Sequence, residues 1–273
     1  MKSIIIVIGM LVSLQLWAGV DEVRLEEAVA GSHRTLAYVA RDVYRHPAET
    51  LSFFDIQPQH TVVEVWPGGG WYTEILAPYL RNSGLLIAAH YDSGDTQASY
   101  RPSSRKSFED KMASAPDVYD EVQVTSLSFD EKAGTLAIGA ADADSVDRVV
   151  TFRNAHGWRA SGTTDAAFAH FFAILKTGGK LGIVQHRADP EQDWTSRNIG
   201  YVGREYMLAA ATSAGFELHS EGFFNANPLD NKRYTRGVWQ LPPSYSDTTG
   251  EEARAPFKAI GESDRMTLVF VKP

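Results

Sequence analysis

A glycine-rich segment in the first third of the chain carries the residues with the clearest chemical potential. The apolar run Thr61–Trp66 is followed by Pro67, three glycines at 68–70 and the pair Trp71-Tyr72. Such a run predicts a parallel strand buried on both faces. Glycines between that strand and the next helix let a ligand approach the backbone near the helix N-terminus. Glu64, near the strand's end, can accept hydrogen bonds from a cationic or hydroxyl-bearing ligand.

Two polar clusters follow strands that the hydrophobic pattern predicts later in the chain. Arg153-Asn154-Ala155-His156-Gly157-Trp158 follows a strand at 145–152, and Gln185-His186-Arg187 ends a strand at 181–185. Parallel strands bring such segments to one rim of the sheet. Asn154 can hold a nucleophile and His156 can accept its proton, although a structural role for His156 fits the sequence equally well. The candidate substrate contacts are Arg153, Trp158, His186 and Arg187; for Trp158, core packing is the favoured interpretation.

The elements that must position these residues alternate between β-branched runs and helical stripes, which is typical of an α/β sheet. Helices are predicted at 23–44, 72–80, 105–115, 164–175 and 204–214, and strands at 61–66, 85–89, 122–124, 145–152, 181–185, 216–224 and 266–271. We expect one domain over residues 20–273. It has a helical lead at 20–58 and a loop-rich cover at 225–263, where Arg233, Tyr234 and the nearby Arg265 are further possible substrate contacts.

The strand, acid, glycine turn and helix resemble motif I of class I S-adenosylmethionine (SAM)-dependent methyltransferases. More narrowly, segments 66–73, 151–156 and 261–267 resemble a bacterial group of exported predicted methyltransferases. The resemblance implies a Rossmann-like, mostly parallel seven-stranded sheet with helices on both faces and an antiparallel last strand. It also implies SAM as the cofactor and methyl transfer to a small-molecule or exported acceptor. The implied cofactor-binding residues are Glu64, Trp66, Pro67, Gly68, Gly69, Gly70, Trp71, Tyr72, His90 and Asp92.

The sequence departs from the family pattern where the nucleoside of SAM would be held. Trp66 replaces a glycine, and His90 stands where the family has the acid that binds the ribose, with Asp92 the nearest acid. Residues 125–127 contain no acid for the adenine. These departures favour an alternative, a non-catalytic exported binding protein that retains the fold. A nicotinamide site is less consistent, because Thr73 replaces the third glycine of that motif.

The composition of the chain excludes several kinds of site and partner. The 273 residues include 26 Lys and Arg, 34 Asp and Glu and no Cys, and the formal charge is -8. The absence of Cys excludes disulfides, thiolate metal sites and a Cys nucleophile. The acidic balance argues against nucleic-acid binding. The eight His residues lack metal-ligand spacing, so no metal site is expected, although the acid-rich stretch 142–147 leaves a weak cation site open.

The first 19 residues differ from the rest of the chain. Lys2 precedes an apolar run of about a dozen residues and a small-residue exit at Ala18-Gly19, which predicts a signal peptide. The run is shorter than the ~20 residues of a membrane span. We therefore expect a periplasmic or secreted protein without a stable membrane span, with an uncleaved anchor or a buried first helix as alternatives. The oligomeric state does not follow from the sequence.

Overall fold

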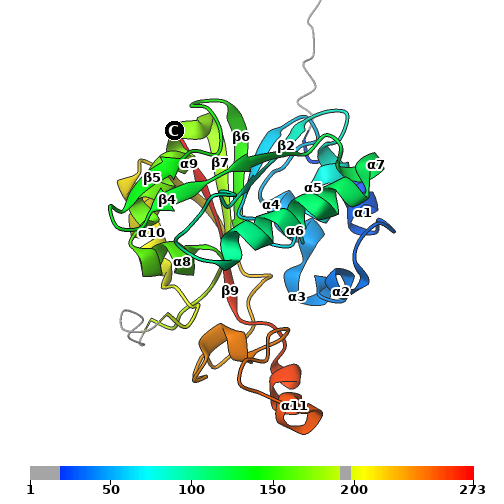
Figure 1. Ribbon diagram of the computed structural model, residues 1–273, viewed down its shortest axis with the longest axis vertical. Helices are drawn as coiled ribbons and strands as arrows, with labels where there is room; N and C mark the ends of the chain where they lie inside the picture. The colour runs from blue at the N-terminus through cyan, green and yellow to red at the C-terminus, as the bar shows by residue number, and fades with distance from the viewer. Residues whose placement is uncertain (1–18, 191–197) are drawn as a thin grey trace, which may run out of the picture.

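A seven-stranded sheet forms the centre of the computed structural model, which describes residues 19–190 and 198–273 (Figure 1). The predicted signal peptide therefore lies, except for Gly19, outside the described residues. The order of the strands is β3-β2-β1-β6-β7-β9-β8. Their bounds are β1 Thr61–Val65, β2 Leu85–His90, β3 Gln123–Ser126, β6 Val146–Phe152, β7 Leu175–His186, β8 Glu217–Gly222 and β9 Arg265–Val271.

The direction of the strands confirms the predicted Rossmann-like fold. The pairs β1–β2, β1–β6, β2–β3 and β6–β7 are parallel, whereas β9 runs antiparallel to both β7 and β8. The strand latest in the sequence is thus inserted between two earlier ones. Every helix among the described residues is too short or too polar to cross a bilayer.

Helices cover both faces of the sheet and build a core on each. Alternate residues of a strand point to opposite faces, so that Val62 belongs to one core and Val63 to the other. The core on the face of Val62 is closed by α1 Glu22–Val29, α4 Pro47–Phe53, α5 Thr73–Leu80, α6 Tyr100–Ser114 and α7 Pro116–Tyr119. The opposite core is closed by α8 Ala155–Ser161, α9 Thr164–Ile174 and α10 Arg204–Ser213.

The predicted helical lead is broken into short pieces. The range 23–44 contains most of α1, all of α2 Leu36–Val39 and most of α3 Asp42–Arg45. After α1 the backbone turns at Gly31, and α3 ends at His46, whose φ of 42° lies in the left-handed region. These breaks let the chain bend around the end of the sheet, so that residues of the lead reach the rim on which the strands end.

Three other segments differ from the sequence prediction. The polar segment that follows β6 forms, from Ala155, the helix α8, which is not among the predicted helices. The polar stretch before β3 contains a longer helix than predicted, α6, and the hairpin β4 Ser128–Asp130 with β5 Thr135–Ile138 was not predicted. β5 is exposed along its whole length, so it has no buried face that would produce a hydrophobic pattern.

The predicted cover at 225–263 contains the 3-10 turn Gly237–Gln240 and the helix α11 Glu251–Ile260. Figure 1 shows it (orange) below the sheet, beside the chain that enters β9.

Candidate functional site

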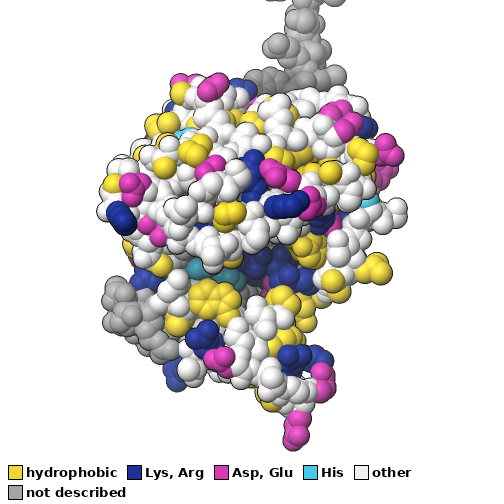
Figure 2. Space-filling view, in the orientation of Figure 1, with side chains coloured by type: hydrophobic (Ala, Val, Ile, Leu, Met, Phe, Trp, Pro, Cys, Tyr) yellow, Lys and Arg dark blue, Asp and Glu magenta, His cyan; other side chains and the backbone are white. Residues whose placement is uncertain are grey.

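A cavity of about 320 Å³ lies where β1, β6 and β7 end at their carboxyl sides. The glycine turn forms one wall, Tyr38, Arg41 and Arg45 of the lead form a second, and Trp239 and Ser244 of the cover contribute to a third. Figure 2 shows the hollow between the body of the molecule and the cover, with basic and histidine side chains inside. Three segments that are far apart in sequence thus enclose one polar site.

The glycine turn adopts the backbone conformation that its composition predicts. Gly68 and Gly70 have φ values of 59° and 79°, in the region that glycine enters without a steric penalty. A Cβ placed on Gly68 would meet no atom within 4 Å. Gly68 is also one of the residues that line the cavity. Gly70 is not among the lining residues and turns toward Phe108 and Thr73 instead.

Glu64 contributes a buried carboxyl group to the same wall. Its carboxylate accepts a hydrogen bond of 2.6 Å from the Thr73 hydroxyl at the start of α5. Burial raises the pKa of Glu64 to about 7, against the opposing effects of Thr73 and Lys111. Near neutral pH this group can therefore lose its proton when a cationic ligand group approaches.

Trp66 lines the cavity directly after β1, where the methyltransferase motif that the sequence resembles has a glycine. Its φ is 45°, and its indole N–H donates to the Leu127 carbonyl oxygen, just beyond β3, at 2.9 Å. The ring lies 5.0 Å from the ring of Tyr91 and 5.8 Å from that of Trp158. Trp66 and Tyr91 both line the cavity, whereas Trp158 is fully buried behind them. This end of the site is therefore aromatic.

His90 is occupied by bonds within the protein. Its Nδ1 accepts from the Tyr91 backbone N–H at 2.8 Å, so its Nε2 carries the proton and donates to the Gly68 carbonyl oxygen at 3.2 Å. Burial lowers its pKa to about 4, which keeps the ring neutral. His90 thus supports the glycine turn from behind. Asp92 accepts from the Gly94 N–H at 3.1 Å, and neither residue is in the wall.

Trp71 and Tyr72 both line the cavity at the start of α5. The Trp71 ring packs against the guanidinium groups of Arg34 and Arg45, whose central carbons lie 5.2 and 4.7 Å from its centroid. Tyr72 stacks on Phe152 with a centroid separation of 3.5 Å. Both rings are therefore already engaged with neighbouring side chains.

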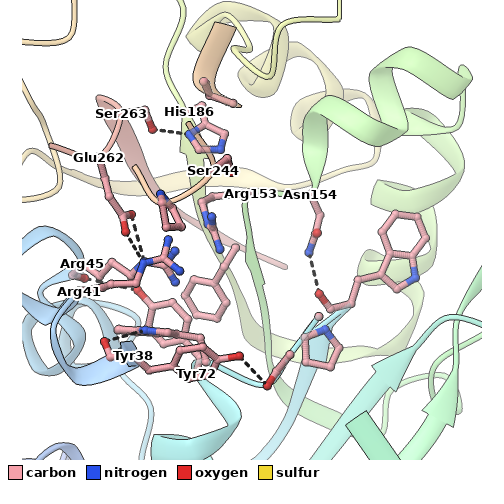
Figure 3. Close-up of a pocket in the computed structure, with 18 of the residues that line it drawn as sticks. Tyr38, Arg41, Arg45, Tyr72, Arg153, Asn154, His186, Ser244, Glu262 and Ser263 are labelled. Atoms are coloured by element: carbon pink, nitrogen blue, oxygen red, sulfur yellow. Dashed lines mark hydrogen bonds and ion pairs between the residues drawn. The ribbon is translucent and has the colours of Figure 1, made fainter. Parts of the chain in front are cut away.

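Four arginines surround a single carboxylate beside the cavity. Glu262 forms ion pairs with Arg41 at 2.5 Å, Arg45 at 3.1 Å and Arg265 at 3.3 Å. Burial alone would raise its pKa, but the arginines, Arg45 first, lower it to about 2. The fourth arginine, Arg153, lies beside this group (Figure 3), and its charge also lowers the pKa of Glu262. In the described part of the chain its guanidinium forms no hydrogen bond or ion pair.

Two neutral histidines complete the wall near Arg153. The His156 and His186 rings lie 6.0 Å apart, and His186 Nδ1 is 2.5 Å from the Ser263 hydroxyl. Burial lowers the pKa of both rings, that of His156 to about 4, with the charge of Arg153 adding to the effect. His156 Nδ1 is buried without a hydrogen-bond partner among the described residues. It is thus available as a proton acceptor or donor toward a ligand.

The remaining predicted site residues divide between the wall and the body of the protein. Asn154 is in the wall, but its amide donates to the Val65 carbonyl oxygen at 2.8 Å and so ties β6 to β1. Arg187 is outside the cavity, paired with Asp264 at 2.7 Å. The cavity therefore brings together Glu64, Trp66, Pro67, Gly68, Gly69, Trp71, Tyr72, Arg153, Asn154, His156 and His186, and not Gly70, His90, Asp92, Trp158 or Arg187.

Sequence reasoning missed the contribution of the lead and of the chain before β9. Tyr38, Arg41, Arg45 and Glu262 line the cavity, and none of them belongs to a strand-end motif. Arg41 and Arg45 are four residues apart, which is about one helical turn. This spacing predicts that the two side chains lie on the same face of a helix, and it is the only indication of their position in the sequence. Of the possible contacts placed near the cover, Arg265 reaches the site through Glu262, whereas Arg233 and Tyr234 are not among the lining residues.

The fold is shared with solved methyltransferase structures, although no family model and no curated protein matches the sequence. A geranyl diphosphate methyltransferase in complex with SAM is similar with a TM-score of 0.58 at 13% identity, over 91% of this chain and 95% of that one. A SAM-dependent methyltransferase from Aquifex aeolicus is similar with a TM-score of 0.50 at 14% identity, over 74% and 91%. The chain therefore has the class I methyltransferase fold.

Proposed function

We propose that this protein is a SAM-dependent methyltransferase that acts on an unidentified small-molecule or exported acceptor. The observation that carries the proposal is the open backbone of Gly68, at the carboxyl end of β1, which faces the same cavity as His156 and Arg153. In α/β sheets of this kind, ligands bind at the carboxyl ends of the strands. The solved structures with this fold support SAM as the ligand.

The residues that line the cavity fit SAM. Polar groups can bind its amino acid end, and aromatic rings can bind its nucleoside. The glycine turn and Glu64 offer backbone polar groups and a carboxyl group to the amino acid end. The aromatic faces of Trp66 and Tyr91 offer stacking to the nucleoside, in place of the acid–ribose hydrogen bonds that His90 does not supply. When bound, SAM supplies an electrophilic methyl group.

The chain's own residues then have separate tasks. His156, neutral and with a free ring nitrogen, accepts the proton of a protic nucleophile. Asn154 holds the ends of β1 and β6 together, and so fixes the turn relative to His156. The cover, through Trp239 and Ser244, closes the cavity on the side of the acceptor and limits the access of water.

A titration of the full chain with SAM and with its demethylated product tests the cofactor. We expect both ligands to raise the melting temperature, since a ligand at ~100 times its dissociation constant adds roughly 2.7 kcal/mol to the folded state. Gly68→Val should abolish the effect, because its side chain would enter the open space that the ligand needs. Gly178→Val is the matched control: Gly178 has a φ of 77°, no atom within 4 Å of its Cβ position and no place in the cavity wall.

The expected pattern is a ligand-induced shift that the Gly178 variant keeps and the Gly68 variant loses. The absence of a shift in the wild type at millimolar concentrations of both ligands would rule out the methyltransferase proposal.

One observation favours the second candidate, a non-catalytic binding protein. The indole N–H of Trp66 and the Nε2–H of His90 both donate to backbone carbonyl oxygens of the protein. Neither is therefore free to form a hydrogen bond with the nucleoside. A chain that binds other ligands in this cavity and fails the SAM titration would have this function. In either case the residues at 1–19 support the proposal that the protein is exported.

A further inference from the structure

We propose that Arg153 binds an anionic group of the methyl acceptor, a carboxylate or a phosphate, so that the enzyme selects anionic small molecules. The description of the ligand as a methyl acceptor rests on the function proposed above. The anion site itself rests on the arrangement of charged groups in the cavity, and it stands whether or not SAM binds.

The charges around the cavity are unbalanced. Arg41, Arg45 and Arg265 share the single carboxylate of Glu262, and Arg153 adds a fourth guanidinium beside them. Glu64 is only partly ionised at neutral pH, because burial raises its pKa to about 7. In addition, the buried Nη2 atom of Arg45 has no hydrogen-bond partner among the described residues. An anion in the cavity would compensate an excess of positive charge that is costly to bury.

The backbone holds Arg153 in place for this task. Its φ of 66° is in the left-handed region, which a residue with a Cβ rarely adopts. Its N–H donates to the Val184 carbonyl oxygen at 2.7 Å, so pairing with β7 fixes this conformation at the end of β6. Strained backbone that the surrounding structure maintains is concentrated at functional sites. Burial lowers the pKa of Arg153 to about 10, which leaves the guanidinium charged at neutral pH.

The position of Arg153 indicates the acceptor and not the cofactor as its ligand. Figure 3 shows its side chain on the side of His186, Ser263 and Ser244, whereas Tyr38 and its bond to the glycine turn lie at the other end of the cavity. His156 also lies on the side of His186, 6.0 Å between rings. An acceptor whose anion is held by the planar, two-pronged guanidinium would therefore present its nucleophile near a neutral base.

Binding of simple anions to the full chain tests the inference. The probes are inorganic phosphate and benzoate, with benzamide as the neutral counterpart of benzoate, at constant ionic strength, with and without the demethylated product of SAM. We expect benzoate or phosphate to bind, benzamide not to bind, and the demethylated product to bind together with the anion. Arg153→Gln should weaken anion binding by at least about tenfold, because a hydrogen-bonded charge partner is lost.

Two further variants separate recognition from folding. Arg153→Lys keeps the charge without the two-pronged geometry and should give an intermediate affinity. Arg81→Gln removes an arginine from an exposed pair with Asp120 outside the cavity wall, and should bind the anions as the wild type does.

Three results would overturn the inference: wild-type anion affinity in Arg153→Gln, no binding of either anion by the wild type, or displacement of the demethylated product by the anions. The last result would mean that Arg153 holds the carboxylate of the cofactor. Anion binding that depends on Arg153 in a protein that binds neither SAM nor its product would instead refute the methyltransferase and support the anion site.

Discussion

Trp66 shows at the scale of one residue how a substitution in a glycine motif is accommodated. Its backbone adopts a φ of 45°, the conformation that favours glycine. For a residue with a Cβ this conformation costs roughly 1 to 2 kcal/mol. The cost is offset by the indole, which packs among Tyr91, Phe129 and Trp158 and donates to the Leu127 carbonyl oxygen. The side chain thus maintains a backbone conformation that its own type disfavours.

This balance predicts an unusual order of stabilities for two variants. Loss of the indole should destabilise both Trp66→Ala and Trp66→Gly, by about 3 kcal/mol for the alanine variant. The glycine variant should be the more stable of the two by about 1 kcal/mol, because only glycine adopts this conformation without strain. Urea unfolding of the two variants measures the difference.

Trp158 provides the opposite case. It lies inside α8, where glycine is about 1 kcal/mol less favourable than alanine. Trp158→Gly should therefore be less stable than Trp158→Ala. If Trp66→Gly were likewise the less stable member of its pair, the left-handed conformation of Trp66 would be wrong.

At the scale of elements, Glu262 connects the N-terminal lead with the segment that precedes β9, two parts of the chain that are far apart in sequence. Arg41 and Arg45 come from the lead, around α3, and Glu262 from the segment between α11 and β9. The three side chains form one wall of the cavity. This carboxylate, together with the hydrogen bond from Arg265 to the Tyr44 carbonyl oxygen, therefore ties the lead to the C-terminal part of the molecule at the cavity wall.

Removing this carboxylate should destabilise the protein at neutral pH. Glu262→Gln leaves buried arginines without a partner, and breaking a buried pair in this way costs about 3 to 5 kcal/mol. Because the folded pKa of Glu262 is about 2, below its ordinary value of 4.5, its contribution is complete above pH 4.5 and is lost as the pH falls toward 2. The unfolding free energies of variant and wild type should therefore converge over that range.

Urea unfolding at several pH values between 3 and 7 tests this expectation. Glu251→Gln is the matched control, because Glu251 forms an exposed pair with Lys258 and its loss should change stability little. A difference between Glu262→Gln and wild type that stays constant down to pH 3 would contradict the assigned role of the arginines.

At the scale of the whole molecule, the two cores share the same strands. Val62 and Val184 belong to the core that contains Leu25 of α1 and Leu51 of α4, and their neighbours Val63 and Ile183 belong to the opposite core. The lead is thus built into the sheet's own core.

We therefore expect one cooperative unfolding transition for the full chain. Far-ultraviolet and near-ultraviolet circular dichroism should give the same midpoint, and the calorimetric enthalpy should equal the van't Hoff enthalpy. An earlier transition with loss of helix signal only would indicate that the lead unfolds independently of the sheet.

The sequence predicts the sheet better than it predicts the cavity, for a physical reason. Buried parallel strands such as β1 and β6 are almost continuous apolar runs, which are recognisable in the sequence. The three consecutive glycines after β1 likewise predict a tight turn. The walls formed by Arg45 and Glu262 depend on how loops bend, and spacing along the chain does not encode that. The direction of the Trp66 indole and the bonds of His90 likewise depend on neighbours that are distant in sequence.

The place of β9 has a consequence for how the protein is made. This strand follows all other strands in the chain, yet it lies between β7 and β8 and supplies buried residues to both cores. During synthesis β8 has no neighbour to pair with, and β7 keeps an unpaired edge, until Arg265–Val271 has left the ribosome. The nascent chain therefore stays incomplete, and open to chaperones, until translation has passed the final strand.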